Sequence, residues 1–273
     1  MNSASSIQLS VALVTRNRPE QLRRALGSLA GQSVQPREVI VSDDSDAGNS
    51  LEVRAIAGEF GARYVEGPRQ GLYANRNAAA VAVTGTHVRT MDDDHTLPAG
   101  HLAQCLAAME KDPAAIWTCG EEGYLDDQRH AFLGRAIQLQ ASGVGAEVDN
   151  PDDNWGIADG ATIYPREVFE RGFRFAETFP FGSSYLEFGA LLYRYGWRSR
   201  CIPDAYIEHR YDSATLTRTS PASVLYASLC YNLRFRPSRL RALRYLVPAL
   251  LRTPRLVREV PGLIRLMGAR WSR

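Results

Sequence analysis

Three aspartates and a histidine stand in a row at Asp92-Asp93-Asp94-His95, directly after a predicted strand. Adjacent carboxylates repel one another, so a fold that presents them has to offset the repulsion with a cation. In an extended segment alternate residues point the same way, which predicts that Asp92 and Asp94 bind one ion. Oxygen ligands select Mg²⁺ or Mn²⁺, which also accept phosphate oxygens. The alternative is a solvated acidic turn, or a helix N-cap cluster before Ala99.

A second acidic group, Asp43-Asp44-Ser45, follows another short apolar run. A carboxylate at such a strand end can accept hydrogen bonds from a base N–H or a ribose hydroxyl. The alternative is that these residues form a turn or cap a helix.

Arg76 follows the Gly71 turn, where a guanidinium can bind a diphosphate in bidentate fashion or pair with a nearby acid. No G-x-G-x-x-G follows the first strand and no G-K-[ST] loop is present, which weakens the NAD-binding and ATPase interpretations.

These polar groups follow an alternation of strand-like and helix-like segments. Strands are predicted over 7–14, 38–41, 62–65, 87–91 and 115–118, and helices from Pro19 and over 51–60, 72–83 and 99–111. Short connections between alternating strands and helices imply an α/β fold with a mostly parallel sheet covered on both faces. Ligands of such sheets bind beyond the carboxyl ends of the strands, so residues 15–17, 43–45 and 92–94 should converge on one crevice.

After about residue 120 the alternation of strand-like and helix-like segments becomes less regular. Residues 121–158 are rich in Gly, Asp and Asn and predict long loops, with one helix near 131–140. A helix is predicted over 185–195, followed by short strands over 199–203 and 205–209.

The charges are distributed unevenly along the 273 residues. Residues 1–233 carry 21 basic and 29 acidic side chains, a net charge of −8, whereas residues 234–273 carry 11 arginines against one acid, Glu259. Leucines alternate with these arginines, which predicts short basic amphipathic helices. Such a tail can lie on an anionic membrane surface; packing on the domain or a dimer contact is the alternative.

Targeting signals and cysteine usage suggest a compartment. Residues 1–6 lack the basic patch and apolar core of an export signal, and no uncharged apolar run reaches the ~18 residues of a spanning helix. The four cysteines are widely spaced without a C-x-x-C pair, so we expect reduced thiols and no zinc site. These features predict a cytoplasmic protein, peripheral on the inner face of the cell membrane where its tail binds lipid.

The runs VALVTRNRPEQLRRALGSLAGQSVQPREVIVSDDS and GLYANRNAAAVAVTGTHVRTMDDDH, in this order and spacing, resemble glycosyltransferase family 2. The resemblance is close over about residues 7–115 and looser over 159–209, and it implies a GT-A fold. It implies that Asp43 reads the base, that Arg76 faces the diphosphate, and that Asp92 and Asp94 bind the metal. It also implies that Thr15 and Arg16 lie against the nucleotide. With Asp44 and Asp93 beside them, the predicted nucleotide-sugar site comprises Thr15, Arg16, Asp43, Asp44, Arg76 and Asp93.

The segment SSYLEFGALLYRYGWRSRCIPDAYIEH resembles the part of the family that carries the catalytic base. Ser184 and Tyr185 stand where the family has Glu-Asp, so the base is assigned to Glu187. A tyrosine is a poor base at neutral pH, because its reference pKa is about 10. The other candidates for this role are Asp152, Asp153 and Asp159.

Three further positions complete the candidate site. His209, after the Pro-Asp-Ala turn, would be a metal or phosphate ligand by resemblance, with a packed histidine at a strand end as the alternative. Trp155 and Asp159 fall in the acceptor-side segment. A tryptophan there can stack on a sugar ring or pack in the core.

The sequence therefore predicts a metal-dependent inverting glycosyltransferase that moves a sugar from a nucleoside diphosphate, with UDP or dTDP favoured, to a carbohydrate or lipid-linked acceptor in cell-envelope polysaccharide, glycolipid or glycoconjugate synthesis. We expect a catalytic domain over 1–233, divided near residue 118 into nucleotide-sugar and acceptor halves, and a tail over 234–273. A sugar-nucleotide-forming nucleotidyltransferase is the first alternative, but the Gly-rich basic loop it normally shows is missing between Val14 and Leu22. A nucleic-acid-binding protein is the second, and the acidic body argues against it.

Overall fold

A computed structural model describes residues 7–125, 128–179, 181–211 and 220–272. Residues 1–6, where we expect no export signal, lie outside the described residues. The strands are β1 (Leu9–Thr15), β2 (Glu38–Asp43), β3 (Arg63–Glu66), β4 (His87–Asp92), β5 (His95–Thr96), β6 (Ile116–Leu125), β7 (Gln128–Leu133), β8 (Ile137–Leu139), β9 (Gly145–Glu147), β10 (Ile163–Pro165) and β11 (Ser199–Tyr211). The helices are α1 (Pro19–Ala30), α2 (Ala47–Glu59), α3 (Leu72–Ala82), α4 (His101–Lys111), α5 (Glu167–Glu170), α6 (Ser184–Arg194), α7 (Pro221–Cys230), the π-helical turn η2 (Tyr231–Phe235), α8 (Arg239–Arg252) and α9 (Leu256–Trp271).

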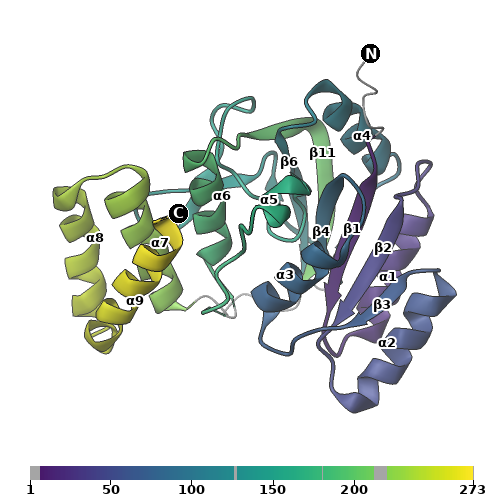
Figure 1. Cartoon of the computed structure of the whole chain (residues 1–273), viewed down its shortest axis with the longest axis horizontal. Coiled ribbons are helices and arrows are strands. Elements are labelled where there is room, and N and C mark those ends of the chain that lie inside the picture. Colours follow the sequence, from purple (N-terminus) through teal and green to yellow (C-terminus); the bar gives the residue numbers. More distant parts are fainter. Residues whose placement is uncertain (1–6, 126–127, 180, 212–219, 273) are drawn as a thin grey trace.

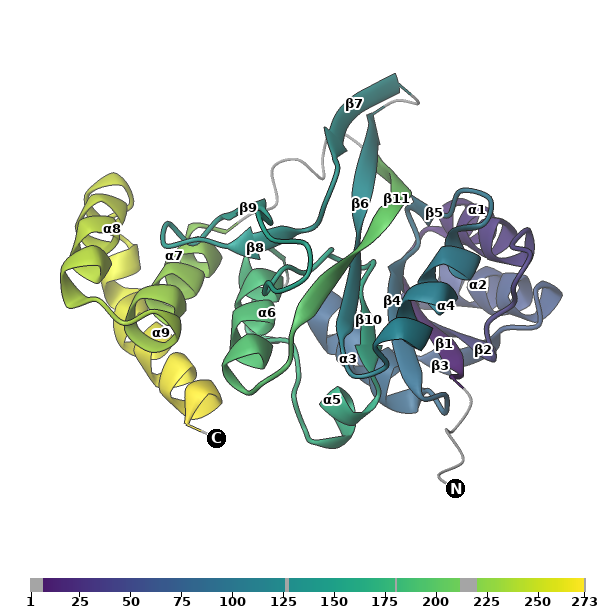
Figure 2. The ribbon, with the colours of Figure 1, turned by 90° about the horizontal axis from the view of Figure 1, so that it is seen from above.

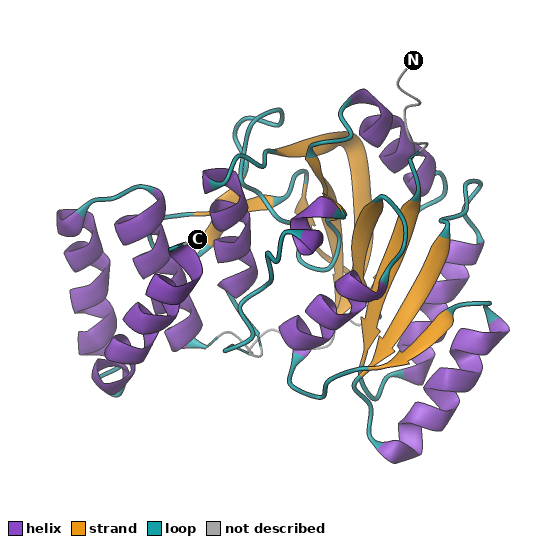
Figure 3. Ribbon diagram, viewed as in Figure 1, coloured by secondary structure: helices purple, strands orange, loops and turns teal. Residues whose placement is uncertain are grey.

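The main sheet has the strand order β3-β2-β1-β4-β10-β6-β11-β5, with β7 added to β6. Strands β3, β2, β1 and β4 are parallel, as predicted, so their carboxyl ends lie at one edge of the sheet. Strand β10 is antiparallel to both of its neighbours, and β11 runs parallel to β6, so the whole sheet is mixed (Figure 3). The predicted strands near 199–203 and 205–209 are one strand, β11, with an irregularity in its pairing to β6 between Cys201 and Tyr206.

The two faces of the sheet bury different helices. Strand residues alternate in direction, so Val11 and Leu13 pack against α1, α2 and α4, whereas Ala12 and Val14 pack against α3 and the helices that follow β10. The α/β architecture with helices on both faces is therefore confirmed (Figure 1).

The expected helix near 131–140 is wrong. This segment contains β7, which forms a long antiparallel hairpin with β6, and β8, which pairs with β9 (Figure 2). Both pairings join neighbouring segments of the chain, and the residue types of 131–140 do not distinguish such strands from a helix.

The C-terminal helices pack beside the sheet, on the side of α6 (Figure 1). Helix α8 begins where the Ser238 hydroxyl accepts a hydrogen bond from the Arg241 backbone N–H, which satisfies one free donor of the first turn. Helix α9 packs on α7 and buries Leu256, Leu263 and Met267 in the same hydrophobic cluster as α6 and α7. Residues beyond 234 thus share a core with the body. No helix in the described part of the chain combines the length and apolarity needed to cross a bilayer.

Candidate active site

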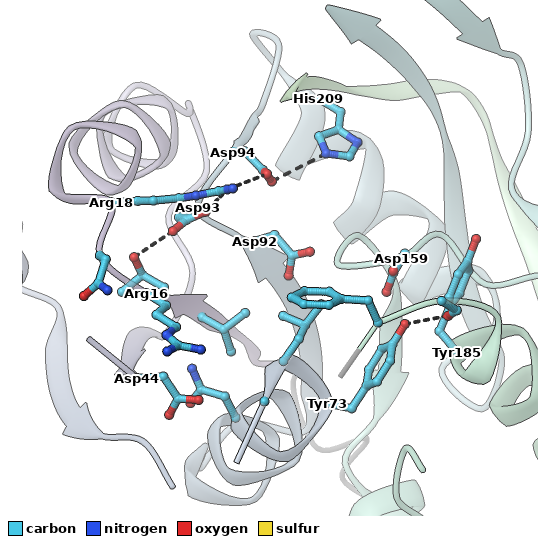
Figure 4. A pocket seen from close by; sticks show the side chains of 18 residues that line it. Arg16, Arg18, Asp44, Tyr73, Asp92, Asp93, Asp94, Asp159, Tyr185 and His209 are labelled. Atoms are coloured by element: carbon cyan, nitrogen blue, oxygen red, sulfur yellow. Dashed lines mark hydrogen bonds and ion pairs between the residues drawn. The ribbon is translucent and has the colours of Figure 1, made fainter. Parts of the chain in front are cut away.

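The carboxyl ends of β1, β2 and β4 lie around one cavity of about 590 Å³ (Figure 4). Helix α3, the segment around residues 181–185 and β11 complete its walls. The predicted site residues that line it are Thr15, Arg16, Asp44, Asp92, Asp93, Asp94, Asp159 and His209. The structure therefore brings together side chains from separate strand ends, as the sequence pattern predicted.

Asp92 and Asp159 share one arginine. Arg76 has no exposed surface, and its guanidinium donates to both carboxylate oxygens of Asp92, at 2.8 Å each, and to Asp159. Arg76 itself does not line the cavity. Burial raises the pKa of Asp159, and the charge of Asp92 adds to this, while Arg76 opposes it. The arrangement leaves two carboxylates around one cation.

Gly160 makes this arrangement sterically feasible. Its φ is +62°, and a Cβ on this residue would stand 2.5 Å from the Asp92 carboxylate carbon. A glycine is therefore required both by the backbone conformation and by the approach of Asp92.

Asp93 ties two strand ends together. The Thr15 hydroxyl donates to its carboxylate at 2.7 Å, and Arg18 donates at 3.3 Å. Burial, together with the neighbouring charge of Asp94, raises the pKa of Asp93 to about 7. Asp93 is thus bound within the wall that joins β1 to β4.

Asp94 lies in a turn, because the extended backbone of β4 ends at Asp92. One of its oxygens, Oδ2, accepts from Arg18 at 2.9 Å, and the other, Oδ1, lies 3.6 Å from His209 Nε2 and 3.8 Å from His95 Nε2. Burial alone would raise the pKa of Asp94, but His209, His95 and Arg18 hold it below its usual range. Burial likewise opposes protonation of His209, but Asp94 and Glu121 raise its pKa well above the ordinary value.

Among the described residues, Asp94, His95 and His209 form a group whose ligand atoms all lie within 4.8 Å of one another. These residues fit a divalent ion, because a carboxylate and two imidazoles are common ligands. Sequence reasoning assigned Asp92, Asp94 and His209 to the metal and did not consider His95, whereas in the structure both oxygens of Asp92 accept hydrogen bonds from Arg76. Its position directly after the acidic triplet was the available signal.

The nucleotide side of the cavity is formed by β1 and β2. Asp44 lines the cavity and accepts a hydrogen bond from the Arg69 backbone N–H at 2.8 Å, and burial raises its pKa. Asp43 is outside the lining: it accepts from the Ser45 backbone N–H at 2.8 Å and from the Tyr64 hydroxyl at 3.0 Å. Asp43 therefore holds the loop that presents Asp44.

Glu187 does not line the cavity either. It is fully buried on α6, where its carboxylate accepts hydrogen bonds from Arg270 at 2.9 Å, Trp271 at 2.7 Å and Tyr226 at 3.4 Å. These contacts join α6 to the end of α9. Tyr185, two residues earlier, does line the cavity, and burial raises its pKa well above 10.

Trp155 also stands outside the cavity lining. Its indole N–H donates to the Leu139 carbonyl at 2.9 Å, and its ring packs edge-on against Tyr193 and Phe235. These contacts match the core-packing alternative for this residue.

Similar solved structures share this fold. GalNAc-T7, solved with UDP, GalNAc and Mn²⁺, matches with a TM-score of 0.65 at 18% identity, over 83% of this chain and 47% of that one. TarS of S. aureus matches with a TM-score of 0.61 at 18% identity, over 90% of this chain and 43% of that one. Its fragment 1–349 in complex with UDP-GlcNAc matches with a TM-score of 0.64 at 17% identity, over 97% of this chain and 80% of the fragment. The chain thus spans less than half the length of GalNAc-T7 and of the longer TarS chain.

A search of curated proteins finds no match to this chain. A family model described as "Glycosyl transferase family 2" matches residues 10–173, which is more than half of the sequence. The strand order, the cavity at the strand ends and this match agree with one another. The chain belongs to glycosyl transferase family 2, and its sheet and helices form the GT-A fold.

Proposed function

We propose that this protein is a metal-dependent inverting glycosyltransferase that uses a nucleoside diphosphate sugar. The observation that carries the proposal is that Asp94 and His209, a pair suited to a divalent ion, face the same cavity as Thr15 and Asp44. A volume of about 590 Å³ is in the range of small-ligand sites.

For the donor we propose UDP or dTDP sugars. GalNAc-T7 was solved with UDP and the TarS fragment with UDP-GlcNAc, and both share the fold of this chain. Thr15, Arg16 and Asp44 would lie against the nucleotide, because they surround the strand ends on the side of β1 and β2.

Asp94 and His209 would hold a Mn²⁺ or Mg²⁺ ion, with Glu121 orienting the imidazole through its contact to His209 Nδ1 at 2.9 Å. Such an ion, when bound, supplies Lewis-acid stabilisation of the negative charge on a departing diphosphate. Arg18, which lies between Asp93 and Asp94, would place a second positive charge at this wall. Arg76 would act indirectly, by holding Asp92 and Asp159 in place.

For the base we favour Asp159, which lines the cavity and keeps 33% of its side chain exposed. A raised pKa makes its carboxylate a better proton acceptor than an ordinary aspartate, and it would take the proton of an attacking acceptor hydroxyl. Direct attack by that hydroxyl inverts the anomeric carbon. The assignment of the base to Glu187 stays a prediction, and Glu187 lacks this support because it does not line the cavity.

For the acceptor we propose a lipid-linked or membrane-borne carbohydrate of cell-envelope synthesis, reached from the cytoplasmic face. Helix α8 exposes an apolar stripe of Leu240, Leu243, Val247 and Leu251. The exposed residues Arg239, Arg244 and Arg252 lie on the same helix, so its charge is complementary to an anionic leaflet.

The proposal is tested by incubating the whole protein with a panel of nucleotide sugars, Mn²⁺ or Mg²⁺, and candidate acceptors. Release of a nucleoside diphosphate with transfer to an acceptor is the expected result. Release of pyrophosphate from a sugar phosphate and a nucleoside triphosphate would replace this activity with nucleotidyl transfer. Retained anomeric configuration in the product would reject the inverting mechanism.

A further inference from the structure

His95 is a buried histidine on β5 whose ring orientation is determined by one contact. The residue is 1% exposed, and its Nδ1 lies 3.1 Å from the carbonyl oxygen of Gly160. A carbonyl only accepts hydrogen bonds, so Nδ1 carries the proton and Nε2 of the neutral ring carries the lone pair. This Nε2 atom is buried and has no hydrogen-bond partner among the residues that the structure describes.

The nitrogen of His95 that carries the lone pair lies near Asp94, which lines the cavity. This Nε2 lies 3.8 Å from Asp94 Oδ1, an oxygen that is also buried and that accepts no hydrogen bond from the described part of the chain. The pairing of β5 with β11 sets His95 opposite His209, and the two rings meet edge-on with centroids 4.6 Å apart. His209 Nε2 lies 3.6 Å from the same Asp94 oxygen.

A buried acceptor that lacks a hydrogen bond is destabilising, because it has lost its contact with water. Among the described residues, His95 Nε2 and Asp94 Oδ1 are two such acceptors, and they face each other here. Two ligand atoms that each lie about 2.1 Å from one ion stand roughly 3–4 Å apart, which is the spacing seen around Asp94 Oδ1. One cation between them would satisfy both acceptors.

Asp92 is not available in the same way. Both of its oxygens are occupied by Arg76, at 2.8 Å, and it stands before the turn that separates it from Asp94. The residue that can join Asp94 in binding an ion is therefore sought on β5 and not on β4.

We propose that His95 is a ligand of the divalent cation, together with Asp94 and His209, and that the Gly160 carbonyl orients it. This inference rests on the proposed function for the presence of a cation, and it names the ion class. One carboxylate with two imidazoles favours a transition-metal ion over Mg²⁺, with affinity rising from Mn²⁺ to Co²⁺. The carbonyl contact fixes the tautomer that a metal requires.

The test measures metal binding to the whole protein without any sugar nucleotide. Mn²⁺ alone is titrated and followed by electron paramagnetic resonance, and pulsed spectra count the coupled imidazole nitrogens. We expect saturable binding with two coupled imidazoles, at least tenfold tighter than Mg²⁺ measured by competition. Absence of binding, one imidazole, or equal affinity for Mg²⁺ would overturn the inference.

Variants of His95 test whether this residue supplies the second imidazole coupled to Mn²⁺. His95→Gln should lose one nitrogen coupling and weaken Mn²⁺ binding at least tenfold, and His95→Asp should shift the preference toward Mg²⁺. The matched control is His101→Gln, which changes a similarly buried histidine on α4 that does not belong to the group of Asp94, His95 and His209. Unaltered nitrogen coupling in folded His95→Gln, judged by circular dichroism, would refute the assignment.

The two proposals fail separately. Two-imidazole Mn²⁺ binding without any sugar transfer would remove the proposed function and keep this site. Metal-dependent transfer with normal Mn²⁺ binding in His95→Gln would remove the ligand role of His95 and keep the function.

Discussion

At the scale of single residues, the cavity wall is a set of carboxylates that face different partners. Asp92 is bound by Arg76, Asp93 by Thr15 and Arg18, and Asp94 divides its two oxygens between Arg18 and the histidines. The three adjacent aspartates thus have three roles, because a turn separates the third from the strand that carries the first. Only Asp94 keeps an oxygen without a hydrogen bond.

Replacing Asp94 with Ala should abolish metal-dependent transfer while leaving the protein folded. The change removes the carboxylate that would hold the ion, and Arg18 keeps its contact with Asp93. We expect turnover to fall by at least about 100-fold, with an unchanged circular dichroism spectrum. Glu52→Ala, at an exposed position on α2, is the control. Near-normal turnover of Asp94→Ala would rule out the metal role of this residue.

Gly160→Ala tests the packing beneath Asp92. A Cβ would stand 2.5 Å from the carboxylate carbon in addition to a strained φ of +62°. Gly196→Ala is a matched control, since its φ is +96° but a Cβ there would meet nothing within 4 Å. Backbone strain costs about 1–3 kcal/mol at either position, so the free energy of unfolding in urea should fall further for Gly160→Ala. Equal losses of the free energy of unfolding in the two variants would show that the Asp92 side chain moves away from the added Cβ at little cost.

At the scale of secondary-structure elements, a contact joins α6 to the C-terminal helix α9. Glu187 is completely buried and accepts from the side chains of Arg270 and Trp271, 83 and 84 residues further along the chain. Helix α6 also carries Tyr185 to the cavity. The C-terminal helix is therefore part of the framework that supports this wall.

Arg270→Met should destabilise the protein by about 3–5 kcal/mol, because the Glu187 carboxylate would remain buried without its cation. The double variant with Glu187→Gln should lose less than the sum of the single changes, as coupled residues do. Chemical denaturation of all three variants gives the coupling free energy. Strict additivity would show that the pair does not interact.

Glu187→Gln also separates two roles for this residue. A catalytic base would give about a 100-fold loss of turnover at unchanged stability. The observed contacts predict the reverse: a lower free energy of unfolding, with near-normal turnover of the folded protein. A loss of turnover without a loss of stability would restore the base assignment.

At the scale of the whole molecule, the cationic helices α8 and α9 lie at one end (Figure 1). The cavity lies at the carboxyl edge of the parallel strands. Helix α9 is anchored in the core through Trp271, whereas α8 exposes most of its apolar stripe, with Leu240 at 80% exposure. The same tail thus combines packing on the domain with an outward surface. The predicted packing on the domain describes α9, and binding of α8 to an anionic membrane stays a prediction.

Sedimentation with vesicles tests this outward surface. Binding to anionic vesicles should exceed binding to neutral ones and should fall as salt rises. Changing Arg239, Arg244 and Arg252 to Gln should weaken binding on the order of 100-fold, from about 1 kcal/mol per arginine. The control changes Arg54, Arg63 and Arg129, which are exposed on the body. Salt-insensitive binding, or equal losses in both triple variants, would contradict a lipid surface at α8.

The sequence by itself determined the parallel strands β1 to β4, their helices and the polar residues at their carboxyl ends. These features follow from local apolar periodicity, because the spacing of apolar residues within a strand or helix indicates which of its faces is buried. It also predicted that Asp44 and Asp94 lie near one another, through the topology that alternating strands and helices impose, whereas His209 was assigned to this site by the family resemblance.

Only the tertiary structure decided which partner each of these groups has. Arg76 occupies Asp92, Arg270 occupies Glu187, His95 points at Asp94, and residues 128–133 pair with β6 as a strand. Each of these contacts joins segments whose meeting depends on side-chain packing or on a turn in the backbone. No residue type or local spacing encodes such a meeting, since the free energy that selects it is distributed over the whole core.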